Sequence, residues 1–165
     1  MNLSSRILPP GNIVLDLAAT SKKRAFEHAG LLFENNQGVA RMSVFHSLLA
    51  RERLGSTALG HEVAIPHGRL KDLREPHAAF IRLAAPIRFD ANDGRTARLL
   101  FFLLIPEAAT QMHLDLLASI ARLMSDADVR QVLTQSTDST AIHQLLLNGP
   151  HAQSTEHADH SRADS

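Results

Sequence analysis

The feature that most constrains the fold is one uninterrupted apolar run near the middle of the chain. It reads Leu-Leu-Phe-Phe-Leu-Leu-Ile from Leu99 to Ile105. Because apolar and polar residues do not alternate, we expect Arg98 to Ile105 to form a central strand covered on both faces. Pro106 ends the strand, since proline has no amide hydrogen to give to a sheet. The run is far shorter than the roughly 20 apolar residues of a membrane-spanning helix.

Shorter patterns on either side of this run predict an alternation of strands and helices. Further strands are expected at residues 12–15, 63–65 and 77–83, with an edge-like piece at 86–90. Helical spacing and capping residues predict helices from Thr20 or Ser21 to about 35, and at 43–54, 110–125, 126–134 and 136–147. Interleaved elements of this kind indicate an α/β sandwich around a mixed sheet. The stretch from Pro86 to Arg98 allows an antiparallel hairpin within it.

The composition narrows the functional classes. The 165 residues carry no net charge with His neutral, so no global field favours nucleic acid or an anionic membrane as a partner. Cys is absent, which excludes disulfides, thiolate nucleophiles and cysteine-bound metals, and Trp and Tyr are absent too, which removes their stacking on bases. The N-terminus lacks the apolar core of a signal peptide, so we expect a cytoplasmic protein without membrane insertion.

The end of the chain differs in composition from the rest. From Asn148 onward it is polar, rich in His, Ala, Asp and Ser, and without apolar periodicity. We therefore expect one domain over residues 1–147 and a disordered tail over residues 148–165. The tail histidines His151, His157 and His160 are interpreted as solvated side chains rather than as metal ligands.

The strongest candidate for chemistry is a histidine at the exit of the strand expected at 63–65. His67 stands between Pro66, which restricts the backbone, and Gly68, which removes bulk, so its ring can be presented to a partner. The ordinary interpretation is a loop histidine that bonds a carbonyl. The neutral ring, however, has a lone pair that can attack a phosphoryl group and hold it as phosphohistidine. The residues alone leave both interpretations open.

Arg51 is the second candidate. It lies in the last turn of the helix expected at 43–54, just before the loop that begins at Gly55. It is either a solvated cation that suits a helix C-terminus or a clamp for phosphoryl oxygens, for which the planar guanidinium is well shaped.

His113 is the third candidate, in the first turn of the helix expected at 110–125. Helical spacing there predicts one apolar face, formed by Leu114, Leu117, Ile120, Ala121 and Met124. On this prediction the His113 side chain points away from the apolar face, as an ordinary surface histidine does. If the ring instead lies beside His67, it can donate a hydrogen bond to a phosphoryl oxygen.

Other kinds of site lack their sequence patterns. The small-residue loop from Gly55 to Gly60 has no following Gly-Lys-Ser/Thr, so a nucleotide site is not expected, although its N–H groups and hydroxyls can still face a phosphoryl group. The chain contains no His-Glu-x-x-His pattern and no Gly-x-Ser-x-Gly elbow. We therefore expect no metal and no cofactor.

Three segments together resemble a known family. They are Arg-Glu-Arg-Leu-Gly-Ser-Thr from Arg51, Ala-Ile-Pro-His-Gly-Arg up to Arg69, and Met-His-Leu-Asp-Leu-Leu from Met112. In order and spacing they resemble the enzyme IIA domains of the fructose/mannitol class of the bacterial phosphotransferase system. The match is best with the nitrogen-regulatory branch, and it extends from about residue 3 to residue 147.

The resemblance implies a fold and a set of site residues. The fold is a single-domain α/β sandwich with a mixed, roughly five-stranded sheet flanked by helices. His67 matches the histidine that accepts a phosphoryl group on Nε2, Arg51 matches the arginine near it, and His113 matches the second histidine beside it. The donor is a phosphorylated HPr-like carrier protein, called NPr in the regulatory branch, which we expect to dock on exposed apolar side chains such as Leu59.

The resemblance also implies a function. We expect a phosphotransferase that regulates partner proteins, such as kinases or transporters, according to its phosphorylation state. One alternative is a sugar-transport component that passes the phosphoryl group to a IIB domain, and another is a phospho-switched binding regulator without onward transfer. The family's loop has more glycine where this chain has Ala58, Leu59 and Glu62, which bears on the flexibility of the loop.

Overall fold

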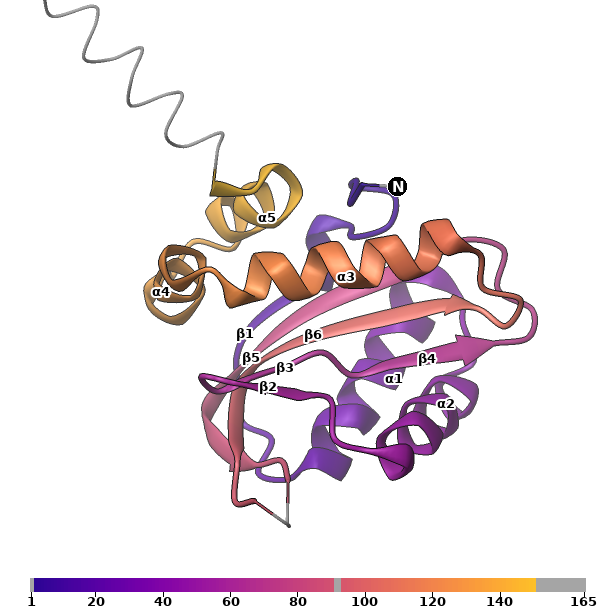
Figure 1. The fold of residues 1–165 in the computed structure, drawn as a ribbon, viewed down its shortest axis with the longest axis horizontal. Coiled ribbons are helices and arrows are strands. Elements are labelled where there is room, and N and C mark those ends of the chain that lie inside the picture. The colour runs from indigo at the N-terminus through magenta and orange to yellow at the C-terminus, as the bar shows by residue number, and fades with distance from the viewer. Residues whose placement is uncertain (1, 91–92, 151–165) are drawn as a thin grey trace, which may run out of the picture.

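The computed structural model describes residues 2–90 and 93–150 of the chain. They form three layers with a mixed sheet in the middle (Figure 1). One face of the sheet is covered by α1 (Lys22–Gln37) and α2 (Arg41–Leu54), and the other by α3 (Gln111–Ser125), α4 (Ala127–Gln135) and α5 (Ser139–Asn148). The predicted α/β sandwich is confirmed.

The described sheet has six strands, of which five follow one another across it. Their order is β1 (Ile13–Leu17), β5 (His77–Arg88), β6 (Thr96–Pro106), β3 (Val63–Ala64) and β2 (Ala58–Gly60). The sixth strand, β4 (His67–Leu70), also pairs with β6. A short 3-10 helix, Pro10–Asn12, precedes β1. The β5–β6 pair is antiparallel, as the hairpin expectation allowed, whereas β3 and β4 run parallel to β6.

The apolar run lies at the centre of the sheet, as predicted. Every side chain from Leu99 to Ile105 is at most 2% exposed. Alternate residues, beginning with Leu99, pack against the α3–α5 layer, and those beginning with Leu100 pack against α1 and α2. At about 1.5–3 kcal/mol for each large apolar side chain removed from water, this one strand contributes strongly to both cores.

The short strand β4, which begins with the candidate histidine, continues the line of β3 along β6. Val63 pairs with Leu99 in β3, and His67 pairs with Leu103 in β4, so the register against β6 is the same in both. Between them, the carbonyl of Pro66 accepts from the Leu103 amide at 3.0 Å. The prediction that His67 lies just beyond a strand is therefore corrected, because His67 is the first residue of β4.

Two further strand predictions need correction. The pieces expected at 77–83 and 86–90 form the single strand β5, with a register irregularity between Arg82 and Ile87. Residues 58–60, expected to be loop, form β2 and pair antiparallel with β3. Short Gly-containing pairs of this kind carry little alternation, so the sequence pattern does not reveal them.

The helices agree with the prediction except at their ends. Ser21 caps α1 by accepting from the Arg24 amide at 3.2 Å, and Gly38 ends it in the left-handed region with φ of 70°. Asp126 caps α4, as predicted. The last helix begins at Ser139 rather than Ser136, because the Asp138 carboxylate caps it.

The described chain stops shortly after α5. Most of the tail expected at 148–165, with His151, His157 and His160, lies outside the described residues. Its disorder and the domain boundary at 147 stay predictions.

Candidate functional site

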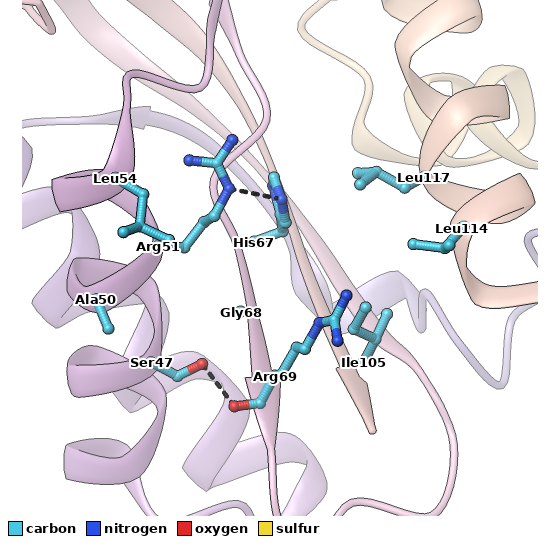
Figure 2. A pocket seen from close by; sticks show the side chains of 10 residues that line it. All are labelled: Ser47, Ala50, Arg51, Leu54, His67, Gly68, Arg69, Ile105, Leu114 and Leu117. Carbon is cyan, nitrogen blue, oxygen red and sulfur yellow. Dashed lines mark hydrogen bonds between the residues drawn. The ribbon is translucent and has the colours of Figure 1, made fainter. Parts of the chain in front are cut away.

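His67 lies at a cavity of about 410 Å³ between α2, β4 and α3. The cavity is lined by Ser47, Ala50, Arg51, Leu54, His67, Gly68, Arg69, Ile105, Leu114 and Leu117. Figure 2 shows His67 between Arg51 on the α2 side and Leu114 and Leu117 on the α3 side. The fold thus brings Arg51 and His67, which are 16 residues apart, into direct contact.

Hydrogen bonds to both ring nitrogens select one tautomer of His67. Nδ1 lies 2.9 Å from the carbonyl oxygen of Ile65, which can only accept, so Nδ1 carries the proton. Nε2 accepts from Nε of Arg51 at 3.2 Å, and a guanidinium can only donate. The neutral ring therefore directs the lone pair of Nε2 toward Arg51.

The surroundings also keep the His67 ring uncharged. Burial lowers the pKa of His67 below the ordinary value of 6.5, and the nearby Arg51 cation lowers it further, against the opposing effect of the hydrogen bond to Ile65. A neutral imidazole is the nucleophilic form, so the site is suited to attack by Nε2 near neutral pH.

Arg51 is held at two points. Besides the bond from Nε to His67, its Nη1 donates to the carbonyl of Gly55 at 2.8 Å, four residues along the chain. Its Nη2 makes no hydrogen bond within the described chain. The planar guanidinium is thus oriented beside the lone pair of Nε2 with one nitrogen left for another acceptor.

The loop after α2 has several of its hydrogen-bond donors bonded within the protein. The amides of Gly55 and Thr57 donate to Glu52, and the amide of Ala58 donates to the Ser56 hydroxyl. The Thr57 hydroxyl is also bonded to Glu52, at 2.8 Å. These donors are occupied internally, whereas Arg51 donates directly to His67. That other N–H groups and hydroxyls of the loop face a phosphoryl group stays a prediction.

His113 does not point away from the buried face of its helix, and that prediction is corrected. The residue is 8% exposed and shares the buried side of α3 with Leu116, Ile120 and Met124, while Leu114 is 41% exposed. Its Nδ1 accepts from the Thr110 amide at 3.1 Å, which leaves the proton of the neutral ring on Nε2. The structure records no hydrogen bond between His113 and His67 among the described residues.

Arg69 is a cavity residue to which the sequence reasoning assigned no role. It lies two residues after His67 on β4, so both side chains leave the same face of the strand. The period-2 pattern from His67 could have indicated it. Leu59, the expected docking residue, is 43% exposed but does not line the cavity, where Leu54, 85% exposed, lies instead.

Metal-binding clusters and membrane-spanning helices are both absent from the described residues. No group of three or more His, Cys, Asp or Glu side chains in residues 2–90 and 93–150 is arranged to hold a metal ion. Within those same ranges, no helix has the length and apolar character needed to cross a membrane.

Comparison with known proteins places this geometry in a family. The model of the EIIA 2 family of the phosphoenolpyruvate-dependent sugar phosphotransferase system matches residues 6–149. A nitrogen regulatory protein of Pseudomonas aeruginosa is 41% identical over 149 residues, which cover 90% of this chain and 97% of that protein.

Two solved structures have the same fold. The crystal structure of nitrogen regulatory protein IIA-Ntr from Neisseria meningitidis matches with a TM-score of 0.80 and 44% identity, over 86% of this chain and 97% of that one. Enzyme IIA of the mannitol system of Escherichia coli, solved in complex with phosphorylated enzyme IIB, matches with a TM-score of 0.68 and 27% identity, over 84% and 95% of the two chains. The chain therefore belongs to the EIIA 2 family of the phosphotransferase system.

Proposed function

We propose that this protein accepts a phosphoryl group on Nε2 of His67 from a phosphorylated HPr-like or NPr-like carrier. We further propose that it regulates partner proteins according to that state. The observation that carries the proposal is the pair of hydrogen bonds, from His67 to Ile65 and from Arg51 to His67, that leaves a neutral ring with its Nε2 lone pair at the cavity. The similarity to nitrogen regulatory proteins supports the regulatory part.

The proposed step exchanges one N–P bond for another. The lone pair of His67 Nε2 attacks the phosphorus of the carrier's phosphohistidine, and the carrier's ring nitrogen leaves with the electrons of the broken bond. The proton on Nδ1 stays in place, bonded to Ile65. No proton has to be removed from the nucleophile, so the site needs no general base.

Arg51 has two successive parts in this step. In the resting site its Nε occupies the Nε2 lone pair, so that hydrogen bond has to open before attack. The guanidinium, still bonded to Gly55, then stabilises charge on the phosphoryl oxygens. His113 is proposed as a second donor through its protonated Nε2.

The regulatory proposal has one alternative with support of its own. The related mannitol enzyme IIA was solved with phosphorylated enzyme IIB, which is the partner expected of a transport component. Adding a IIB domain to the labelled protein separates the two: loss of label to IIB favours transport. Retained label with partners that bind only one form favours regulation.

The experiment that tests the proposal is transfer of labelled phosphate from a phosphorylated carrier to the protein. We expect acid-labile label on the unmodified protein and none on His67→Ala, because the variant lacks the nucleophile. A matched control is His77→Ala, which removes another half-buried histidine, hydrogen-bonded to Gln37 but outside the His67 cavity. Label that persists on a folded His67→Ala protein would overturn the assignment.

A further inference from the structure

A buried carboxylate beside the site is not used by the step described above. Glu52 follows Arg51 in α2, and its side chain is only 5% exposed. Its Oε1 accepts from Nζ of Lys22 and from the Thr57 amide, both at 3.1 Å, and its Oε2 accepts from the Thr57 hydroxyl at 2.8 Å. Three hydrogen bonds on one buried carboxylate hold the loop after α2 in a single arrangement.

Two hydrogen-bonded routes lead from that loop to the two ring nitrogens of His67. On the first, the carbonyl of Thr57 accepts from the Ile65 amide at 3.1 Å, and the carbonyl of Ile65 faces Nδ1 of His67 at 2.9 Å. On the second, the carbonyl of Gly55 accepts from Arg51, whose Nε donates to Nε2 of His67. Both routes begin at a carbonyl of the loop that Glu52 holds, Thr57 in the first and Gly55 in the second.

From this arrangement we propose that Glu52, acting through Thr57, is a positioning residue that holds His67 in the tautomer with an unprotonated Nε2 and holds Arg51 beside it. The proposal rests on His67 being the phosphoryl acceptor. Glu52 does not touch the reacting atoms. Its effect follows from geometry. A shift of the Ile65 carbonyl weakens the hydrogen bond to Nδ1, and a shift of the Gly55 carbonyl moves Arg51 away from Nε2. Either change allows the ring to exchange its proton between the two nitrogens.

Burial gives the proposal a kinetic signature. The carrier cannot contact a carboxylate that is 5% exposed, so loss of Glu52 leaves the KM for the carrier unchanged. Loss of the ordered loop lowers kcat instead, because fewer molecules have the productive tautomer and arginine position. Removing a residue that orients a ligand at a metal site typically lowers activity by about 10–100-fold, and we expect a loss of the same order for Glu52.

The test compares three variants of the full chain. Glu52→Ala removes all three hydrogen bonds and is expected to lower kcat for labelling by roughly 10–100-fold, with KM unchanged. Glu52→Gln can keep most of the bonds by turning its amide toward the Thr57 hydroxyl, so it is expected to retain most of kcat. Lys22→Met removes the outer ion pair and the contact of the Lys22 ammonium with the Phe89 ring but leaves the Thr57 bonds, so it controls for a loss of stability without a loss of position.

A spectroscopic measurement makes the outcome independent of the carrier. Nitrogen-15 shifts of the His67 ring are expected to show a protonated Nδ1 and an unprotonated Nε2 in the unmodified protein and in Lys22→Met. Glu52→Ala is expected to give averaged shifts. If Glu52→Ala does not fold, Thr57→Val removes the hydroxyl bond alone and is expected to shift the ring in the same direction, with Thr57→Ser as its rescue.

Two results would be decisive against the proposal. One is an unchanged tautomer and unchanged kcat in folded Glu52→Ala or Thr57→Val. The other is a loss of kcat in Lys22→Met as large as that in Glu52→Ala, which assigns Glu52 to stability alone. Failure of the underlying function is recognised separately, by label that persists on His67→Ala.

Discussion

At the scale of single residues, Gly68 controls how closely α2 approaches the site. A Cβ built at this position would lie 2.1 Å from the hydroxyl oxygen of Ser47 and 3.0 Å from the Ser47 backbone carbon. The same hydroxyl donates to the carbonyl of Arg69 at 2.9 Å, so α2 is bonded to β4 at the point where the side chain is missing. A glycine after His67 therefore allows the helix that carries Arg51 to reach the histidine.

Gly68→Ala is expected to destabilise the protein by about 1–3 kcal/mol, the usual effect of overpacking. The free energy of unfolding in urea measures it. Removing the hydroxyl with Ser47→Ala relieves part of the clash, so the substitution should destabilise less in that background. Gly11→Ala is the matched control, because its Cβ would meet only Asn36, at an ordinary 3.5 Å. Equal effects at Gly11 and Gly68 would contradict the packing argument.

At the scale of elements, the β2–β3 hairpin explains how the chain departs from its family's glycine-rich loop. Ala58 pairs with Ala64 in the hairpin, so this position needs no glycine. The turn is formed by His61 and Glu62, with φ of 54° and 62°. Two left-handed residues in succession are typical of a type I′ turn, in which Gly is favoured at the second position. Glu62 thus holds an unfavourable conformation, while its carbonyl accepts from the amides of Arg98 and Leu99 in β6.

Glu62→Gly is accordingly expected to stabilise the protein, by roughly 0.5–1 kcal/mol, because glycine adopts the left-handed region without strain. Thermal unfolding measures the change. Phosphoryl transfer to His67 should stay the same, since the turn does not line the cavity. Glu62→Ala serves as the control, because it removes the carboxylate but keeps the Cβ. A gain in the alanine variant equal to that in the glycine variant would point to charge instead of backbone strain.

At the scale of the whole molecule, burial of histidines couples stability to pH. Burial lowers the pKa values of His67 and His77 below 6.5. The unfolded chain therefore binds more protons than the folded one in the window that begins near 6.5 and extends downward to the lowered values. Since stability rises with pH wherever the unfolded state binds more protons, it must fall as the pH drops through this window.

We expect the melting temperature to rise between pH 5 and pH 7 by an amount that shrinks when either ring is removed. His77→Gln and His67→Gln replace each ring with a group that does not titrate. Scanning calorimetry across the pH range measures the slope for each variant. A slope that is unchanged in the double variant would show that other groups cause the pH dependence.

The sequence alone predicted features that depend on neighbouring residues. The apolar run of β6 and the cap at Ser21 both follow from side chains within one or two turns of where they act. The pairing of Arg51 with His67 was implied by resemblance and not by any local rule. The buried face of α3 was predicted wrongly at His113. Two overlapping sets of residues have helical spacing, one beginning at His113 and one at Leu114, and the prediction chose the set that begins at Leu114.

Contacts between distant segments were decided only by the tertiary structure. Arg82 alternates with apolar neighbours as an outward-facing residue would, yet it is 2% exposed, because its guanidinium binds Asp16 of β1 and the carbonyls of Leu133 and Ser136 beyond the sheet. The same holds for Glu52, whose partner Lys22 lies 30 residues away. Periodicity identifies which residues avoid water locally, but the partners of a buried charge depend on which elements meet. The sequence therefore determined the central strand, the helices and the candidate histidine, because these depend on local patterns. The folded arrangement decided the short strands around His67 and the atoms that select its reactive nitrogen, because these depend on contacts between distant segments.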